Sequence, residues 1–419
     1  SIEFRISNAH NCLFPIAEFV SDEIITKIKF SSPDIEIFLT GQARRKCEII
    51  TSIEFISSIN ESELKLFLSG SELFQEEIAL FKKEVLEGFE IIKAEVLFQK
   101  TIPVIFYLCE KNILSNLLFI TSGSEKHLEA LKSNHKFNIL EIFDSEASIY
   151  KSMDLPYFIP ELREGKFEFD LAQKNGLSSL VEEKDLKGIL HNHSTYSDGN
   201  DTLKDMALYC KELGYEYLGI CDHSKSAFYA NGLKEDRIIQ QHQEIEKLNK
   251  ELAPFKVFKG IESDILSSGE LDYSDDVLNT FDFIVASVHS NLRMDEEKAT
   301  TRLIKAIENK YTTILGHPTG RLLLSRPGYP IDHKKVIDAC SANEVVIELN
   351  ANPYRLDIDW RWIQYAMEKG VMISINPDAH RKEGYHDMHF GVGAARKGGL
   401  TKKMTFNAFS LEEIALKFF

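Results

Sequence analysis

The sequence predicts an α/β protein in which a smaller α+β region precedes a parallel barrel of seven β/α units. After about residue 185, seven short apolar runs alternate with amphipathic helical stretches, a pattern typical of parallel strands joined by helices. Before that point, β-like runs and helical periodicity alternate less regularly. The 419 residues also exceed the usual length of one domain, so we expect two.

The first region is expected to contain four strands and two helices. The strands are Asp34–Leu39, Glu48–Ile56, Ala94–Phe98 and Pro103–Leu108, and the helices are Glu72–Val85 and Lys126–Leu131. Two prolines and a closing glycine in Leu155–Gly165 interrupt regular structure. We therefore expect one domain over residues 1–165 and a second over 166–419.

The barrel strands are expected to end in side chains that bind metal. The strands are Gly188–Leu190, Tyr217–Cys221, Lys256–Ile261, Phe281–Ser287, Thr313–Leu315, Val345–Leu349 and Val371–Ile375. Six of the seven are followed by candidate ligands: His191, His193, Asp198, His223, Glu262, His289, His317, Asp378 and His380. Because parallel barrel strands end at one rim, these nine side chains are expected to converge there.

Imidazole and carboxylate are ligands that suit zinc, manganese or iron. Nine of them suffice for three divalent ions, especially if one carboxylate bridges. The His191-Asn192-His193 segment can aim both imidazoles at one point only if its backbone bends. Clustered divalent ions favour hydrolysis of a phosphoester, and an open rim of nitrogen and oxygen ligands argues against a purely structural site.

The other histidines are expected to have surface or structural roles: His10, His127, His135, His242, His333, His386 and His389.

Composition excludes several classes of protein. The net charge of −16 has the wrong sign for binding nucleic acid through the overall field, so any DNA contact must be local. The six cysteines lack disulfide or zinc-knuckle spacing, and no apolar run is long enough to span a bilayer. We expect a cytoplasmic protein without a membrane partner. The absence of an initiator Met indicates that residues upstream can exist.

The strand-end segments resemble the motifs of the PHP (polymerase and histidinol phosphatase) superfamily. The matching segments are His191–Gly199, Asp222–Ser224, Gly260–Glu262, Ser287–Ser290, Gly316–Pro318 and Asn376–His380. The resemblance implies a distorted, TIM-like seven-stranded barrel with three divalent metal ions. It also implies the ligand sets, which are His191, His193, Glu262 and Asp378 for one ion, Glu262, His289 and His317 for a second, and Asp198, His223 and His380 for the third.

Further segments resemble the PHP domain that is fused to bacterial family X DNA polymerases. In the barrel these are Gly214–Leu218, His317–Leu323, Asn350–Pro353, Asp359–Arg361 and Arg396–Gly398. In the first region, Gly41–Glu48 resembles the nucleotidyltransferase palm, Thr121–His127 the entry to the thumb and Leu155–Gly165 the junction.

The palm departs from the family pattern. Ser52-Ile53-Glu54 stands where the family has Asp-x-Asp, and Ile105 stands where a third Asp would follow. Serine and isoleucine cannot replace anionic ligands for magnesium, so we expect that polymerase activity is lost. The helix-hairpin-helix and fingers parts of such polymerases are not recognisable in this chain.

The subgroup resemblance implies a 3′-5′ exonuclease or 3′-end-processing phosphodiesterase acting on DNA. Glu262, His193 and Asp378 are the expected catalytic metal ligands, and either the third ion or an arginine such as Arg321 or Arg355 is expected to neutralise the departing oxygen. Other cations that could position phosphate are Lys225, Arg326, Arg381 and Arg396 on the rim and Arg44, Arg45 and Lys46 in the palm. Asn350 and Asn352 are candidate sugar or phosphate contacts.

Two alternatives remain open. A phosphatase of a small phosphomonoester would use the same ligands, and the acidic net charge favours it. A non-catalytic DNA-repair scaffold would not need nine converging ligands. Oligomeric state and metal identity stay open.

Overall fold

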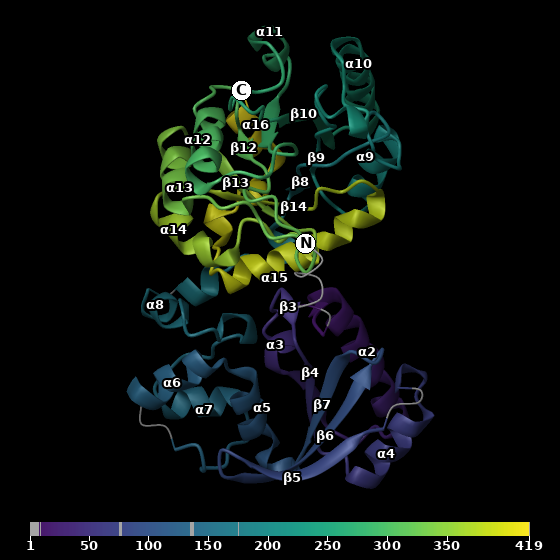
Figure 1. The fold of residues 1–419 in the computed structure, drawn as a ribbon, viewed down its shortest axis with the longest axis vertical. Coiled ribbons are helices and arrows are strands. Elements are labelled where there is room, and N and C mark those ends of the chain that lie inside the picture. The colour runs from purple at the N-terminus through teal and green to yellow at the C-terminus, as the bar shows by residue number, and fades with distance from the viewer. Residues whose placement is uncertain (1–7, 9, 75–77, 135–137, 175, 419) are drawn as a thin grey trace. The chain divides into compact units, whose positions relative to one another are not determined.

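The computed structural model describes residues 8 and 10–418, except 75–77, 135–137 and 175 (Figure 1). They divide into two compact units, Ser1–Leu177 with Leu323–Ser325 and Ser178–Leu322 with Arg326–Phe419. No helix within the described ranges combines the length and apolar character needed to cross a membrane.

The first unit is built on a five-stranded sheet with the order β2-β4-β7-β6-β5. Strands β4 and β7 run parallel, and the other neighbours run antiparallel. The strands are β2 (Ile37–Thr40), β4 (Ile53–Ser57), β5 (Leu80–Leu86), β6 (Phe89–Phe98) and β7 (Ile102–Leu108), with a separate pair β1 (Cys12–Leu13) and β3 (Ile49–Ile50). The helices are α2 (Phe14–Ser31), α3 (Gly41–Arg44), α4 (Glu61–Gly70), α5 (Leu114–Ser122), α6 (Glu125–Asn134), α7 (Glu146–Ser152) and α8 (Glu168–Gln173). This is the smaller α+β domain that the sequence predicted.

The prediction of a helix over Glu72–Val85 is wrong. A short 3₁₀ turn, Glu72–Phe74, is followed beyond residues 75–77 by strand β5, which pairs with β6 along its whole length. Glu87 and Gly88 connect the two strands, and both have positive φ, as a two-residue hairpin loop requires. The long cross-strand pairing outweighs the local helical periodicity.

The basic segment that begins at Arg44 is engaged inside the first unit. Arg44 donates to both carboxylate oxygens of Glu146, and Arg45 pairs with Glu164 at 2.9 Å. Arg163 is fully buried and pairs with the same Glu146. The guanidinium groups of Arg44 and Arg45 therefore stabilise the fold of this unit, which favours a structural role for them over the phosphate contact that they could also make.

The second unit contains seven parallel strands in sequential order, β8 to β14. The strands are β8 (Gly188–Ile189), β9 (Tyr217–Ile220), β10 (Lys256–Asp264), β11 (Phe283–Ser287), β12 (Ile314–Leu315), β13 (Val346–Asn350) and β14 (Ile373–Asn376). The helices are α9 (Leu203–Glu212), α10 (Glu235–Leu252), α11 (Asp275–Leu278), α12 (Glu296–Ile307), α13 (His333–Ala342), α14 (Ile363–Glu368), α15 (Met388–Lys397) and α16 (Leu411–Phe418). Figure 1 shows α12, α13 and α14 side by side on the outside of the strands.

Side-chain caps start three of the barrel helices. Thr202, Asp295 and Asp332 each accept a hydrogen bond from the backbone N–H three residues later, at the beginning of α9, α12 and α13. Such caps satisfy N–H groups that the helix itself leaves unpaired. They define where each helix follows its strand-end loop.

The first and last strands close the barrel through bridging contacts. Asn192 and Ala379 form a parallel bridge, and the N–H of His193 donates to the carbonyl of Ala379 at 2.9 Å. The amide of the buried Asn407 donates to the carbonyls of Gly188 (3.1 Å) and Ile375 (2.7 Å), which lie on strands β8 and β14. The sheet is thus a distorted barrel of seven strands, as the sequence predicted.

The barrel interior is filled by large side chains that face glycines. A Cβ on Gly219 or on Gly260 would lie 2.5 Å from the ring of Phe283, so both strands must carry glycine where this ring crosses the interior. The tightly packed core beneath the rim gives the strand-end side chains a rigid base.

Candidate metal centre

All nine predicted ligands lie together at the C-terminal ends of the barrel strands. They form four overlapping groups in which the ligand atoms lie within 4.8 Å of one another. The groups are His191, His193 and Asp378; His191, Glu262 and His317; His223, Glu262 and His289; and His193, Asp198, His223 and His380.

Three of these residues occupy the left-handed region of backbone space. His191 has φ +61°, His317 +21° and Asp378 +52°. Non-glycine residues rarely adopt such values, and they concentrate at functional sites. The bend at His191 allows both imidazoles of the H-x-H segment to reach one region, and their ring centroids lie 5.4 Å apart.

Glu262 is the hub of the cluster. Its Oε1 lies 3.2 Å from Nε2 of His191 and 3.0 Å from Nε2 of His317. The same oxygen lies 3.1 Å from Nε2 of His289, while Oε2 lies 2.9 Å from Nδ1 of His223. A carboxylate in contact with four imidazoles through both oxygens is suited to bridge two cations.

Two further carboxylates, which the sequence analysis missed, orient the histidines. Oε2 of the buried Glu348 lies 2.6 Å from Nδ1 of His191, and Oδ1 of Asp264 lies 2.5 Å from Nδ1 of His289. Each contact engages one ring nitrogen and aims the other at Glu262, an arrangement that fixes the tautomer of metal-binding histidines. Strand β10 was expected to end near Glu262, but it continues to Asp264. Because Glu262 and Asp264 are two residues apart on this strand, their side chains lie on the same face.

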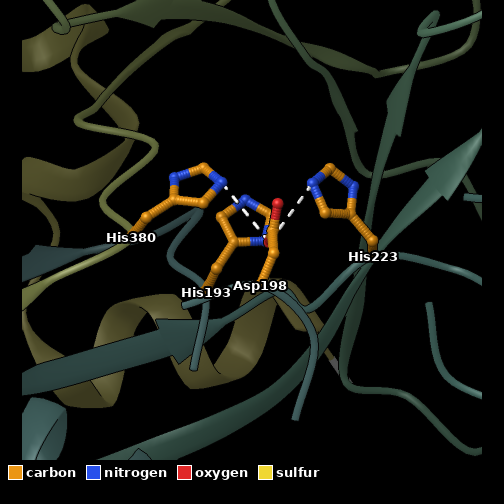
Figure 2. A group of neighbouring side chains, drawn as sticks. All are labelled: His193, Asp198, His223 and His380. Atoms are coloured by element: carbon orange, nitrogen blue, oxygen red, sulfur yellow. Dashed lines mark ion pairs between the residues drawn. The ribbon is translucent and has the colours of Figure 1, made fainter. Parts of the chain in front are cut away.

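The fourth group lies nearest to solvent (Figure 2). The carboxylate of Asp198 lies between His380 and His223, 3.5 Å and 3.7 Å from their Nε2 atoms. The side chains of Asp198 and His380 are 36% and 37% exposed, whereas those of His191 and His193 are fully buried. His380 directs its Nδ1 at the carbonyl of Asp378, so its Nε2 faces Asp198.

The pKa values reflect the close pairing of carboxylates with imidazoles in a buried site. Burial alone would raise the pKa of Glu262 and Asp378, but neighbouring histidines hold both well below the usual range. Burial alone would lower the pKa of His289 and His380, but Glu262 raises the first to about 10 and Asp198 raises the second to about 9. Burial and two neighbouring histidines lower the pKa of His193 to about 3, which keeps this ring neutral.

The donor set fits divalent cations. Within the described part of the chain, Nε2 of His191, Nδ1 of His223 and Oε2 of Glu262 are buried, and their short contacts with one another and with the rest of the cluster do not have the geometry of hydrogen bonds. Buried polar atoms without partners are costly, and a cation in their midst would satisfy them. The chemistry of neutral imidazole and ionised carboxylate matches zinc, manganese or iron.

Polar residues around the ligands are used internally. Asp222 accepts hydrogen bonds from Ser194, Ser197 and Gln241, so it stabilises the loop after β8. Asn350 is fully buried and donates to Glu348 and Asp378. Its amide is therefore used inside the site, which favours a structural role over the sugar or phosphate contact for which it was a candidate.

The predicted arginines occupy different positions. Nε of Arg355 lies 3.6 Å from Oδ2 of Asp378, which places its guanidinium beside the centre. Arg321 pairs with Asp359 at 2.8 Å and donates to the carbonyls of Arg355 and Leu356. It thus holds the segment that carries Arg355.

Three other rim cations are also paired. Lys225 contacts Glu235, Arg326 donates to the carbonyl of Gly320, and Arg396 donates to the carbonyl of Val181.

The three positions at which a polymerase palm was expected to hold magnesium contain one carboxylate, that of Glu54. Strands β4 and β7 place Glu54 directly opposite Ile105, which is 9% exposed. Glu54 accepts hydrogen bonds from Ser52 at 2.7 Å and Tyr107 at 3.2 Å. The strand register and the hydrogen bond from Ser52 therefore bring Ser52, Glu54 and Ile105 together, and Glu54 is the only acid of these three residues.

Comparisons with known proteins agree with this geometry. Residues 190–352 match the family model described as the PHP domain. The chain is 35% identical over 417 residues to the "DNA polymerase/3'-5' exonuclease PolX" of Bacillus subtilis, covering 96% of this chain and 72% of the relative. It is 29% identical over 203 residues to a "Probable phosphatase" of Acetivibrio thermocellus, covering 45% of this chain and 78% of the relative.

Among solved structures, the histidinol phosphate phosphatase of Lactococcus lactis, complexed with zinc, L-histidinol and phosphate, matches with a TM-score of 0.41 and 18% identity. The match covers 51% of this chain and 94% of that one, and an overlap this low does not bear on the substrate.

Proposed function

Since the chain belongs to the PolX-like subgroup of the PHP superfamily and is a metal-dependent phosphoesterase, we propose that it hydrolyses phosphodiester bonds at the 3′ ends of DNA. The observation that carries the proposal is the convergence of nine candidate ligands, with Glu262 at their centre. It is supported by the match of 96% of this chain to a protein named as a DNA polymerase and 3′-5′ exonuclease. Residues 166–419 are assigned to the hydrolase.

Three cations are proposed, in the ligand sets given by the family resemblance. When bound, such cations polarise phosphoryl oxygens and lower the pKa of water toward about 7, so that hydroxide is available as the nucleophile. Glu262 would contribute to two of the positions, and Asp378 and His193 would complete the buried one. Asp198 and His380 would hold the position nearest to solvent.

Arg355 is proposed to bind the scissile phosphate. Its guanidinium beside Asp378 can form two parallel hydrogen bonds with phosphate oxygens and offset their developing charge. Arg321 has a positioning role, because it holds the carbonyls of Arg355 and Leu356. This revises the expectation that either arginine could serve at the departing oxygen.

Residues 1–165 are assigned to a palm and thumb that have lost nucleotidyl transfer. Glu54 faces Ile105 across β4 and β7, so the other two of the three positions that hold magnesium in the resembled palm carry serine and isoleucine, which cannot replace anionic ligands. The unit is left with a supporting or DNA-holding role.

A small phosphomonoester is the second candidate substrate, and similarity to a probable phosphatase over 203 residues favours it. The test is a denaturing-gel time course of the manganese-loaded protein on 5′-labelled single-stranded and gapped DNA, with p-nitrophenyl phosphate alongside. We expect a ladder that shortens from the 3′ end and is absent in His193→Ala and Glu262→Ala. Intact DNA with released nitrophenol would reassign the enzyme to small phosphoesters.

A further inference from the structure

Two aromatic side chains project into solvent beside the metal centre. Phe228 is 86% exposed and Tyr229 is 62% exposed, and both lie in a 3₁₀ turn (Phe228–Ala230) of the loop between β9 and α10. This loop follows the ligand His223 directly. Neither ring contributes to the barrel core, and neither has a role in the hydrolysis described above.

The loop backbone is held firmly even though its rings are exposed. The flanking Ala227 and Ala230 are buried, and the N–H of Ala230 and of Gly232 both donate to the carbonyl of Ala227. A Cβ on Gly232 would lie 1.9 Å from the carbonyl oxygen of Ser224, so the loop closes on itself without room for a side chain. The rings are therefore presented by a fixed backbone.

The same loop is anchored to the metal centre through Asp264. One carboxylate oxygen of Asp264 accepts from the hydroxyl of Ser226 at 2.9 Å, and the other contacts His289 at 2.5 Å. The N–H of Ser226 also donates to Asp272 at 2.6 Å. The position of the aromatic turn is thus tied to that of a metal ligand.

The rings form a short row that leads outward from the ligands. The ring centroid of Tyr229 lies 6.5 Å from that of His223, and the centroid of Phe228 lies 6.0 Å from that of Tyr229, at an interplanar angle of 77°. Besides burial, the carboxylates of Asp264 and Glu262 raise the pKa of the Tyr229 phenol, as expected for a ring at the mouth of the site.

We propose that Phe228 and Tyr229 form a stacking subsite for a nucleobase of the DNA strand that is cleaved. The position of the rings indicates the occupant: they lie beside the metal centre, so a group that stacks on them belongs to the same molecule as the phosphoester bound at that centre. Nucleobases present a flat π-face to aromatic rings whatever their sequence, which suits an enzyme that removes successive nucleotides. The subsite would also distinguish a DNA end from a simple phosphomonoester. This inference rests on the proposed function.

The test varies the base and the ring together. Cleavage is measured on a 5′-labelled single strand with ordinary 3′-terminal nucleotides and on the same strand whose last two nucleotides are abasic (tetrahydrofuran). We expect the wild-type enzyme to prefer the base-bearing end by about tenfold in kcat/KM, the size of one stacking contact. Phe228→Ala should abolish that preference, and Phe228→Trp should retain it.

Ile239→Ala is the control, because Ile239 is also exposed (60%) but lies on α10. It should keep the wild-type preference. If the wild-type enzyme cleaves both ends equally, or if Phe228→Ala keeps the preference, the subsite is refuted while the proposed nuclease function stands. If the wild-type enzyme cleaves neither end, the proposed function itself fails, and the subsite with it.

Discussion

Replacing Glu348 with Gln tests whether this buried carboxylate orients the metal ligands. The carboxylate accepts four hydrogen bonds: Oε2 from Nδ1 of His191 (2.6 Å) and the amide of Asn376 (3.1 Å), and Oε1 from the N–H of His317 (3.2 Å) and the amide of Asn350 (3.0 Å). Glutamine has the same shape as glutamate, but an NH₂ group replaces one of the two carboxylate oxygens. In either orientation this group meets two donors, so two hydrogen bonds are lost.

The expected loss of metal affinity follows from the role of His191, the ligand that Glu348 orients. Loss of such an orienting partner typically costs 10-fold to 100-fold in metal affinity or activity, which is about 1.4 to 2.7 kcal/mol. Each buried group left without a partner adds about 1 to 3 kcal/mol to the loss of stability. We therefore expect Glu348→Gln to bind manganese at least about tenfold more weakly and to melt at a lower temperature.

The assay is a manganese titration of chelator-treated protein, followed by calorimetry or by the resonance signal of free Mn²⁺. Thermal unfolding of the metal-free protein is recorded in parallel, so that weaker binding is separated from unfolding. Glu368→Gln, at the end of α14, is the control. Wild-type manganese affinity in a folded Glu348→Gln protein would refute the orienting role.

Four further predictions test other parts of the chain. Chelation should abolish DNA cleavage and lower the melting temperature, because ligands that bind only the folded state stabilise it; a melting temperature insensitive to chelation and manganese would contradict the metal centre. Arg355→Ala should reduce kcat/KM for DNA about 100-fold, since it removes the cation beside Asp378, and near-normal rates would exclude it from phosphate binding. Glu54→Gln should leave the rate of DNA cleavage unchanged, because the palm carboxylate takes no part in hydrolysis; a large loss in a time course would reopen a palm function. Burial lowers the pKa of His242 to about 4, so as the pH falls below about 6.5 the unfolded chain binds a proton at this residue before the folded chain does. The free energy of unfolding should therefore decline between about pH 6.5 and pH 4, by somewhat less than about 1.4 kcal/mol per pH unit. Urea titrations of His242→Gln should show a shallower decline than those of the wild type.

Much of the barrel could be predicted because its signals are local. Each strand is a short apolar run, and each is followed by a loop whose polar residues stand at a defined place in the chain. The hairpin in the first unit was missed because the run before Glu87 also has helical periodicity. Only its pairing with β6 decides between the two structures.

The arginines show the limit of prediction from residue type. Arg44, Arg45, Arg321 and Arg355 all stand in segments where a cation could meet phosphate. The first two are engaged by Glu146 and Glu164, and the third by Asp359, whereas Arg355 lies at the metal centre. Which carboxylate a guanidinium meets depends on contacts between distant segments, and residue spacing does not contain that information.

The sequence by itself determined the family, the barrel and the nine residues of the candidate metal centre. This was possible because parallel strands deliver their C-terminal ends to one rim, so the order of residues along the chain is enough to place them together. Only the tertiary structure identified Glu348 and Asp264 as the groups that orient His191 and His289, and Phe228 and Tyr229 as rings held beside the ligands. Glu348 and His191 are 157 residues apart, and their contact exists only because barrel closure brings the strands that carry them together.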